Sequence, residues 1–345
     1  MEINLNRFRP AAEQPVDLEG PAALIARTQR PSGEIPWCPH QKTDPWDHVE
    51  AAMGLATAGY LSAARRAYEW LAGEQLPDGS WYSAYFEGVA HDRTRDANMS
   101  AYVAVGVYHY FLLTADRGFV IRMWPAVRRA IDFALSLQAP TGEIHWAISP
   151  AGEVDRMALL TGSSSIFMSV KCALALSGIA GERRPGWQAA LTSLGEAIRT
   201  KPHLFNMTKS RFSMDWFYPV LSGAVSGAEA QRRIERGWKK FVVEGLGVRC
   251  VSDQPWIAIA ETTELALSLA GMGSLDQARV VFGWINERRF EDGSFWAGFT
   301  FPEMTIWPEE RISWTNAGVL IAADAIFGLT PAAALFSHRF WHPLE

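Results

Sequence analysis

Two kinds of helical segment alternate along this chain, and this alternation limits the possible folds more than any other feature. One kind is almost free of charge on every side: residues 97–114 contain no acidic or basic side chain, and residues 312–328 contain only Asp324. The other kind is amphipathic and covers residues 61–75, 118–138, 187–201, 229–243 and 275–289. Since a helix that is apolar all round is buried and an amphipathic one lies at a surface, we expect an inner and an outer layer of helices.

The alternation predicts six helix pairs around one core. Inner helices are expected to begin near His48, Asp96, Leu159, Asp215, Glu261 and Ile312, each followed by an outer helix, and residues 20–29 can supply the outer partner that closes the ring. Six uniformly apolar inner helices favour closure over an open solenoid of helix pairs. We therefore predict an all-α protein, a single (α/α)6 barrel domain over residues 1–345, with residues 1–18 as an N-terminal extension.

A short turn motif recurs between the helices. It reads Gln29-Arg-Pro-Ser-Gly33-Glu-Ile-Pro-Trp37, and it returns at Gln75–Trp81, Gln138–Trp146 and Arg289–Trp296. The glycines are 46, 63 and 151 positions apart, and 151 is about three intervals of fifty, the kind of period that indicates repeated structural units. We expect each copy to end a helix, because glycine allows the left-handed turn and proline prevents continuation.

Composition argues against several classes of protein. A net charge of −5 is unlike a nucleic-acid binder, which presents a basic face. No apolar run reaches the ~18 residues of a membrane span, and the first twenty residues lack the apolar stretch of a secretory signal. The three cysteines lie far apart in no metal-binding spacing, so we expect a cytoplasmic protein with reduced thiols, no metal and no cofactor. The 15 tryptophans suit a groove that stacks on sugar rings.

The starts of the inner helices should meet at one face, which we call the mouth. If every inner helix is followed by an outer return, all inner helices point the same way, and five of the six starts carry acidic residues. Aspartate is a favoured helix cap, so Asp96 and Asp215 can be explained as caps or partners of arginine as readily as site residues. His48 can equally be a core histidine bonded to a carbonyl oxygen, and the Ser163–Ser165 run suits close helix packing better than nucleophilic catalysis.

Two acids are harder to explain as caps. Asp44 and Pro45 already start the first inner helix, so capping does not require Asp47, and glutamate is a poor cap at Glu261. Paired carboxylates, one protonated and one ionised, are what glycoside hydrolysis needs. We predict Asp47 and Glu261 as the catalytic pair, without assigning acid and base; their nonadjacent helices favour the longer separation and inversion of configuration.

Other side chains at the mouth are candidates for substrate binding. Indole rings can stack on sugar rings, and polar groups can bond to hydroxyls. The predicted substrate-binding residues are Trp46, His48, Arg95, Asp96, Asp215, Trp216, Tyr218, Trp256 and Trp314. The expected partner is an oligo- or polysaccharide, with no nucleic acid and no membrane.

The residues also resemble known families of helical toroids. The segment Asp96–Leu137, with Tyr108-His-Tyr-Phe and Trp124-Pro-Ala-Val-Arg-Arg, resembles the helix pair of six-hairpin glycosidases such as glucoamylases. The turn motifs resemble those of terpenoid cyclases and protein prenyltransferases. From about Thr28 to Gly328 the chain resembles an actinobacterial family whose members carry a prenyltransferase label on fold grounds. Its marks here are Thr43-Asp-Pro-Trp-Asp-His-Val-Glu, Tyr68-Glu-Trp-Leu, Thr161-Gly-Ser-Ser-Ser-Ile, Ser213-Met-Asp-Trp-Phe-Tyr-Pro-Val and Gly247-Val-Arg-Cys-Val.

This last family includes hydrolases of methylmannose polysaccharide. The resemblance implies an endo-acting α-mannosidase that cleaves an α-linked polysaccharide, with Asp47 and Glu261 as its carboxylates. A terpenoid or prenyl-transferring enzyme is a second reading, but the chain lacks an Asp-x-Asp-Asp motif and a visible zinc set around Cys250. A polysaccharide lyase or epimerase could enlist Tyr218, His48 and Arg211, although the mouth is acidic. A non-catalytic glycan-binding toroid is the fourth reading.

Overall fold

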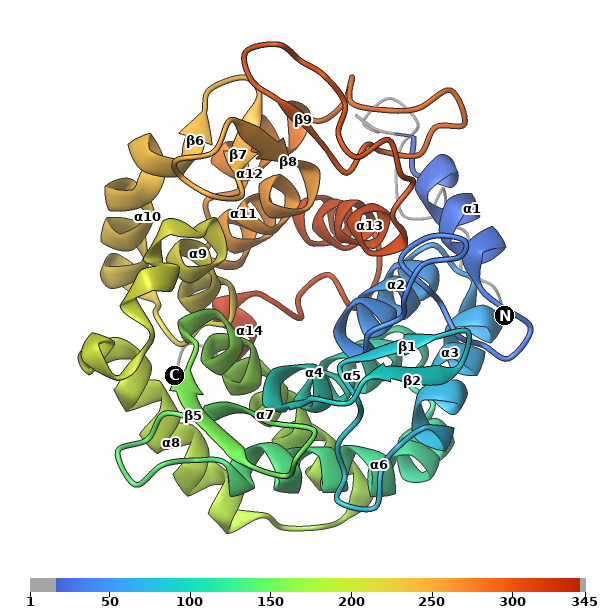
Figure 1. Ribbon diagram of the computed structural model, residues 1–345, viewed down its shortest axis with the longest axis vertical. Helices are drawn as coiled ribbons and strands as arrows, with labels where there is room; N and C mark the ends of the chain where they lie inside the picture. The colour runs from blue at the N-terminus through green and yellow to red at the C-terminus, as the bar shows by residue number, and fades with distance from the viewer. Residues whose placement is uncertain (1–16, 342–345) are drawn as a thin grey trace.

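The computed structural model describes residues 17–341 as a closed ring of two concentric helical layers (Figure 1). The inner layer consists of α2 (Pro45–Thr57), α4 and α5 (Ala97–Ala101 and Val103–Thr114), α7 (Leu160–Ala180), α9 (Ser213–Leu221), α11 (Ile259–Gly271) and α13 (Ser313–Phe327). The outer layer consists of α1 (Glu19–Thr28), α3 (Leu61–Gly73), α6 (Arg117–Ser136), α8 (Pro185–Thr200), α10 (Gly227–Phe241) and α12 (Leu275–Gly283). The predicted (α/α)6 barrel is confirmed.

The ring closes where the two ends of the helical array meet. The last inner helix, α13, packs against both α2 and α1. Of the N-terminal extension predicted over residues 1–18, residues 1–16 lie outside the described residues, and α1 begins at Glu19.

The repeated turns fasten neighbouring outer helices together. The Gln75 side-chain amide donates to the Gly79 oxygen of its own turn and to the Ala126 oxygen of α6, both at 2.9 Å. Gly79 has a positive φ of +93°, and a Cβ there would lie 2.2 Å from the Arg129 oxygen of α6. The other two glutamine copies repeat the pair of bonds: Gln29 with Gly33 and Ala63, and Gln138 with Gly142 and Ala190.

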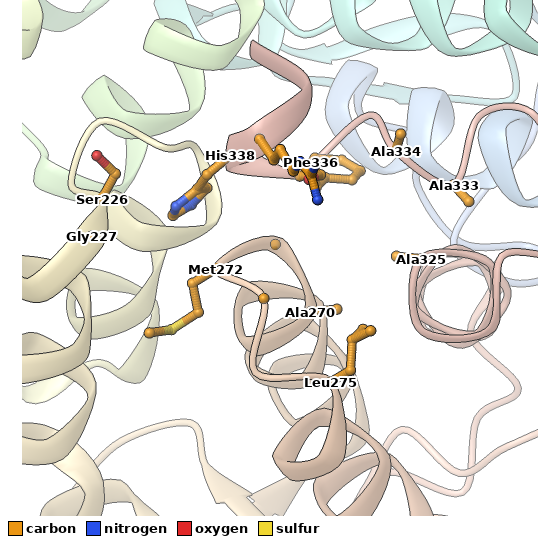
Figure 2. Close-up of a pocket in the computed structure, with 14 residues that line it drawn as sticks. Ser226, Gly227, Ala270, Met272, Leu275, Ala325, Ala333, Ala334, Phe336 and His338 are labelled. Carbon is orange, nitrogen blue, oxygen red and sulfur yellow. The ribbon is translucent and has the colours of Figure 1, made fainter. Parts of the chain in front are cut away.

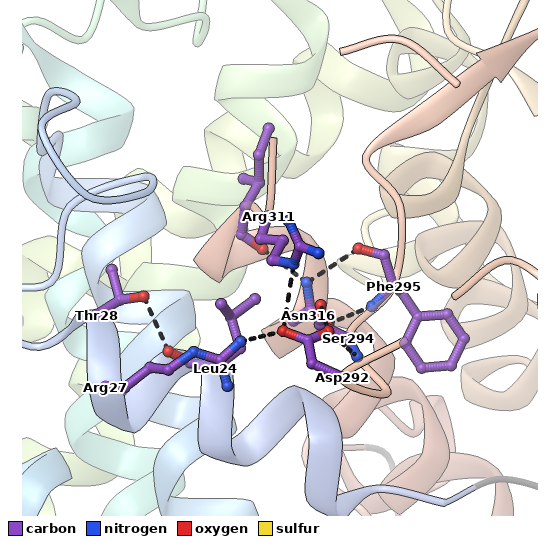
Figure 3. A network of polar contacts seen from close by, with 9 residues as sticks. Leu24, Arg27, Thr28, Asp292, Ser294, Phe295, Arg311 and Asn316 are labelled. Carbon is purple, nitrogen blue, oxygen red and sulfur yellow. Dashed lines mark hydrogen bonds and ion pairs between the residues drawn. The ribbon is translucent and has the colours of Figure 1, made fainter. Parts of the chain in front are cut away.

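The fourth copy of the turn closes the ring by a different set of bonds (Figure 3). Its Asp292 pairs with Arg27 of α1 and, at 3.2 Å, with Arg311. Asn316 of α13 accepts from the Phe295 backbone N–H at 2.8 Å, which ties the same turn to the inner layer. Residues far apart in the sequence are therefore joined at the seam.

Short antiparallel strands lie on the face where the inner helices begin. They are β1 (Ala84–Phe86), β2 (Val89–Asp92), β3 (Arg95–Asp96), β4 (His145–Ile148), β5 (Val154–Ala158), β6 (Val242–Val243), β7 (Gly247–Arg249), β8 (Trp256–Ala258) and β9 (Gly298–Thr300). They form sheets in the orders β1-β2, β3-β4-β5 and β6-β7-β8-β9, and two short 3-10 turns cover Pro202–Leu204 and Met207–Arg211. Because β3, β5 and β8 run directly into inner helices, the sheets build the rim of the mouth.

The C-terminal segment closes the opposite end of the ring. Residues 329–341, which we call the strap, cross the carboxyl ends of the inner helices and end in α14 (His338–Trp341) (Figure 1). Asp324 accepts from the backbone N–H and hydroxyl of Thr330 at 2.7 and 2.6 Å, which fixes the start of the strap. The buried Lys171 ammonium lies 4.6 Å from the centre of the Trp341 ring and fixes its end.

A cavity of about 770 Å³ lies on the strap side. Met272, Leu275, Phe336 and His338 are among the side chains around it (Figure 2). Its walls are largely apolar, and it contains none of the residues predicted for catalysis or substrate binding.

Helix α7 is long and apolar enough to span a membrane by length and composition alone. In the structure 67% of its most apolar stretch is buried, as expected for a helix of the inner layer. Its composition follows from its place in the core.

Candidate active site

Four carboxyl groups gather at the mouth on two inner helices. Asp47 and Glu50 lie three residues apart on α2, and Glu261 and Glu264 have the same spacing on α11. Residues at this spacing share one face of a helix, so each pair forms a short acidic column. Helices α2 and α11 both pack against α13, one on each side, and the two columns therefore flank α13.

The deeper acid of each column lies among aromatic side chains from opposite parts of the ring. Glu50 accepts from the Trp46 indole N–H at 3.0 Å and from the Tyr102 hydroxyl at 3.3 Å. Glu264 accepts from the Tyr218 hydroxyl at 2.6 Å. The Trp46 ring lies 5.5 Å from Tyr102 and 5.8 Å from Tyr218 between ring centres, so these aromatics fill the centre of the ring.

A small cavity lies between these groups. Its free space of about 20 Å³ has room for about one water molecule. On the mouth side it is lined by polar and aromatic groups, and its floor is apolar. The polar and aromatic lining consists of Glu50, Tyr102, Tyr218, Glu264 and Trp314, and the floor includes Leu221, Leu267, Ile321 and Phe336.

The surroundings raise the pKa of all four acids, but to different extents and with different opposing contacts. Burial raises the pKa of Glu50 to about 7, and burial together with the charge of Glu50 raises the pKa of Glu264 well above its usual range. Burial, followed by the charge of Asp44, raises the pKa of Asp47 well above its usual range. Burial also raises the pKa of Glu261, but the Cys250 thiol and a backbone N–H oppose that shift. Protonated and ionised carboxyls can thus coexist here at neutral pH.

Asp44 caps the start of α2, as the sequence predicts. Its carboxylate accepts from the Asp47 backbone N–H at 2.9 Å and from the Trp37 indole N–H at 2.8 Å. The side chain of Asp47 is not needed to start α2, as expected, and it remains partly open to solvent at the mouth.

Two predicted binding residues point away from the mouth. His48 is fully buried, accepts from the Ile35 backbone N–H at 3.1 Å and bonds to the Ala67 oxygen of α3 at 2.9 Å. The core reading of His48 is therefore correct and the binding reading is wrong. Trp216 faces the outer helix α10, where its indole N–H donates to the Arg233 oxygen at 2.8 Å and its ring stacks on Phe241 at 5.3 Å between centres. Its ring is therefore not placed to bind substrate at the mouth.

Three polar candidates are engaged in bonds that hold the rim together. Asp96 caps α4 by accepting from the Met99 backbone N–H at 2.9 Å, and burial raises its pKa to about 6. Asp215 accepts from the hydroxyl and backbone N–H of Thr161 at 2.6 and 3.1 Å, which joins α9 to α7. Arg95 pairs with Asp78 at 2.6 Å. For Asp96 and Asp215 the capping and packing explanation accounts for the observed bonds.

Of the remaining predicted residues, Trp46, Trp256 and Trp314 are partly exposed to solvent, whereas Tyr218 is buried. Trp46, Tyr218 and Trp314 surround the central cavity or its roof, and Trp256 lies on the rim in β8. The indole N–H of Trp314 is buried without a protein partner. Further buried polar atoms without protein partners occur near the starts of inner helices, on Asn98, Ser163, Ser213 and Thr315. Enclosed polar atoms of this kind are ordinarily satisfied by ordered water.

The sequence reasoning missed Glu50, Glu264 and Tyr102. The signal for the two glutamates was present, because each follows a predicted catalytic acid by three residues on the same helix. Tyr102 carries no such signal, since an aromatic residue in an apolar helix is ordinarily part of the core.

The central cavity does not suit a diphosphate. Among the described residues that line it there is neither lysine nor arginine, whereas two glutamates are present. Within residues 17–341, no group of three or more histidine, cysteine, aspartate or glutamate side chains is arranged to hold a metal ion. This distribution of charge disfavours prenyl-diphosphate chemistry at this site.

Comparison with known proteins places this chain among glycosidases. No protein-family profile matches it. The MMP endo-(1,4)-3-O-methyl-alpha-D-mannosidase of Mycolicibacterium hassiacum is 48% identical over 327 residues, covering 95% of this chain and 90% of that protein.

Solved structures share the fold at lower identity. A glycosidase variant in complex with glucose has a TM-score of 0.68 and 17% identity, covering 91% of this chain and 96% of that one. The GH63 mannosylglycerate hydrolase from Thermus thermophilus, in complex with Tris and D-glycerate, has a TM-score of 0.68 and 13% identity, covering 88% and 99%.

Proposed function

The chain belongs to the family of the M. hassiacum endo-mannosidase and is a glycosidase, and from this premise we propose that it cleaves internal α-1,4 bonds of a 3-O-methylmannose polysaccharide. The observation that carries the proposal is the meeting of two carboxyl columns, Asp47–Glu50 and Glu261–Glu264, at one mouth of the ring. Such a site can donate a proton to a glycosidic oxygen and activate water in the same step.

We infer opposite roles for Asp47 and Glu261. Asp47 lies beside the Asp44 carboxylate and keeps its proton to higher pH, which suits the general acid. Burial raises the pKa of Glu261 as well, but hydrogen bonds from the Cys250 thiol and a backbone N–H limit that rise, so Glu261 is the better candidate of the two for the general base. In the proposed inverting reaction, the proton of Asp47 goes to the leaving oxygen while Glu261 takes a proton from the attacking water.

The deeper pair is a second candidate for the same roles. Glu50 and Glu264 line the water-sized cavity, whereas Asp47 and Glu261 do not, and this observation favours the deeper pair as the acids that hold the attacking water. Burial and then the charge of Glu50 raise the pKa of Glu264, so one member of the pair stays protonated while the other is ionised.

Four single variants separate the two assignments. Asp47→Asn, Glu50→Gln, Glu261→Gln and Glu264→Gln are each assayed on methylmannose polysaccharide and on an aryl oligosaccharide whose phenolate leaves without protonation. A variant that has lost the general acid fails on the polysaccharide by a factor on the order of 10²–10⁴ and recovers on the aryl substrate, whereas a variant that has lost the base fails on both.

The same assays test the function itself. Retention of full activity by Asp47→Asn and Glu261→Gln would move the chemistry to Glu50 and Glu264. Release of no reducing ends from methylmannose polysaccharide by the unaltered protein would reject the substrate, and NMR of the first anomer released distinguishes inversion from retention.

A cytoplasmic location remains part of the proposal. It is supported by the three cysteines, Cys38, Cys172 and Cys250, none of which forms a disulfide. Unpaired thiols suit a reducing compartment.

A further inference from the structure

One aromatic side chain on the rim is exposed far beyond what packing explains. The Trp307 side chain is 63% exposed, the highest value for any aromatic residue in the described part of the chain. A large apolar ring left in water forgoes the free energy that burial would contribute, so such a ring is often a contact surface. The candidate site described above includes Trp46 and Trp314 near the cavity and does not include Trp307.

Trp307 is held in place although it is exposed. Its backbone N–H donates to the Gly298 oxygen of β9 at 3.1 Å, and its backbone oxygen accepts from the Trp256 indole N–H at 2.6 Å. The two indole rings meet edge to face, with 6.1 Å between centres and 83° between planes. The backbone that carries the ring is therefore fixed and the ring packs on one neighbour, which lowers the entropic cost of binding.

The tryptophan pair lies on the mouth side of the ring. Trp256 is in β8, which runs directly into α11 and its acids, and Trp307 is in the segment between β9 and α13 (Figure 1). Trp314, which lines the central cavity, follows Trp307 by seven positions. A polymer bound at the cavity and leaving the mouth over β8 and β9 would pass this pair.

The charges near Trp307 in its segment are mostly negative, which disfavours an anionic ligand; the one cation there, Arg311, is paired with Asp292. Glu303 and Glu309 are exposed in the same segment, and Glu310 is partly exposed. The apolar surface is one ring among acids, too small for the roughly 800 Å² per partner that a stable protein interface needs. A neutral sugar ring suits it, because the C–H face of the ring can lie on the indole while its hydroxyls bond to water and carboxylates.

We propose that Trp307, supported by Trp256, is a distal sugar-binding platform that holds a part of the mannan chain outside the cleavage site. The proposal rests on the substrate class proposed above and adds a second contact for the same polymer. Methyl ether groups extend the apolar face of the sugar and therefore strengthen contact with the indole. The platform contributes to binding of long chains only, because a short oligosaccharide bound at the mouth beside the acids does not reach Trp307 on the rim.

The test compares Trp307→Ala with Phe340→Ala in the full chain. Phe340 is a matched control, because it is an exposed aromatic, 38%, in edge-to-face contact with a tryptophan, Trp341, on the strap side. We expect Trp307→Ala to raise KM for methylmannose polysaccharide about tenfold with kcat unchanged, and to leave KM unchanged for the shortest oligosaccharide that the unaltered protein cleaves. Trp307→Phe should restore most of the affinity, and Phe340→Ala should leave KM unchanged for both substrates.

A binding measurement separates failure of the platform from failure of the proposed function. Methylmannose polysaccharide is titrated into the unaltered protein and into Trp307→Ala, with affinity read by calorimetry. Equal affinities, or equal losses for long and short substrates, would overturn the platform. If the unaltered protein binds the polysaccharide through Trp307 but releases no reducing ends, the platform stands and the proposed hydrolysis fails.

Discussion

The Tyr218 hydroxyl of α9 donates a 2.6 Å hydrogen bond to the Glu264 carboxylate of α11 at the centre of the ring. Two adjacent inner helices are thus joined by a polar contact in the interior of the ring. The bond supplies Glu264 with a donor at a place where burial and the charge of Glu50 disfavour ionisation. Tyr218 is therefore expected to act as a positioning residue for the deeper carboxyl pair.

Replacing Tyr218 by phenylalanine should leave Glu264 without its donor. We expect the free energy of unfolding to fall by about 1–3 kcal/mol, because a buried acceptor loses its partner. The pKa of Glu264 should rise further, and this should be visible as a shift in the pH profile of kcat/KM. Tyr68→Phe is the control, since the Tyr68 hydroxyl is buried without a partner. Its loss should leave the free energy of unfolding, measured in urea at neutral pH, nearly unchanged or slightly higher. Equal unfolding curves for both variants would show that the Tyr218 bond contributes nothing to stability.

Glu50 should make the protein less stable as the solution becomes more alkaline. Its pKa in the folded state is about 7, above the ordinary 4.5, so between these values the unfolded state releases the proton first. Stability is therefore lost as pH rises from about 4.5 through 7, by up to about 3 kcal/mol from this group. Glu50→Gln should remove the loss, so urea unfolding at pH 4.5 and pH 8 should differ less in the variant than in the unaltered protein. If the stability difference between pH 4.5 and pH 8 were the same in both proteins, Glu50 would not be the group responsible for it.

Asp44 should set the alkaline limit of activity if Asp47 is the general acid. The Asp44 charge helps to raise the pKa of Asp47, so Asp44→Asn should lower that pKa and move the alkaline limb of kcat/KM by about 1 pH unit towards acid. Asparagine is also a good helix cap, so α2 should still form. An alkaline limb that stays in place in a folded Asp44→Asn variant would argue for Glu50 or Glu264 as the acid.

The turn glutamines should contribute measurably to the stability of the ring. Gln138→Ala removes one hydrogen bond within its own turn, to the Gly142 oxygen, and one to the Ala190 oxygen of the outer helix α8, for an expected loss of about 1–3 kcal/mol. Each kcal/mol corresponds to about 2–4 °C in Tm for a chain of this kind. The exposed Gln188 on α8 is a matched control, and Gln188→Ala should leave Tm within about 1 °C. Calorimetry of the two variants makes the comparison, and equal Tm values would reject the fastening role.

The ring could be predicted because its signal is repeated along the chain. Each charge-free segment, such as residues 97–114, has to be enclosed, and each amphipathic one has to cover it, so the two layers follow from burial alone. The strands could not be predicted in the same way, because segments of two to five residues carry too little periodicity. The fastening role of Gln75 was also hidden, since it depends on a carbonyl group 51 positions away.

The site was harder to predict because neighbouring residues on a helix point in different directions. Asp47 and His48 are consecutive, yet one opens to the mouth and the other binds Ala67 of the outer layer. Asp215 and Trp216 are also consecutive, yet Asp215 bonds to Thr161 of the inner helix α7 and Trp216 bonds to Arg233 of the outer helix α10. Sequence position identifies which turn of an inner helix lies at the mouth, but the direction of each side chain depends on how the helix is rotated against its neighbours.

The strap determines the route by which a long substrate binds and its products are released. Phe336 belongs to the walls of both the central cavity and the cavity on the strap side, so the strap lies between the two. The central cavity has room for about one water molecule, which is too little for a sugar chain to pass. A polysaccharide cannot be threaded through and drawn along by its end. Each segment has to enter and leave by the same opening, and we expect successive cuts to be independent encounters that release a broad range of fragment lengths early in the reaction.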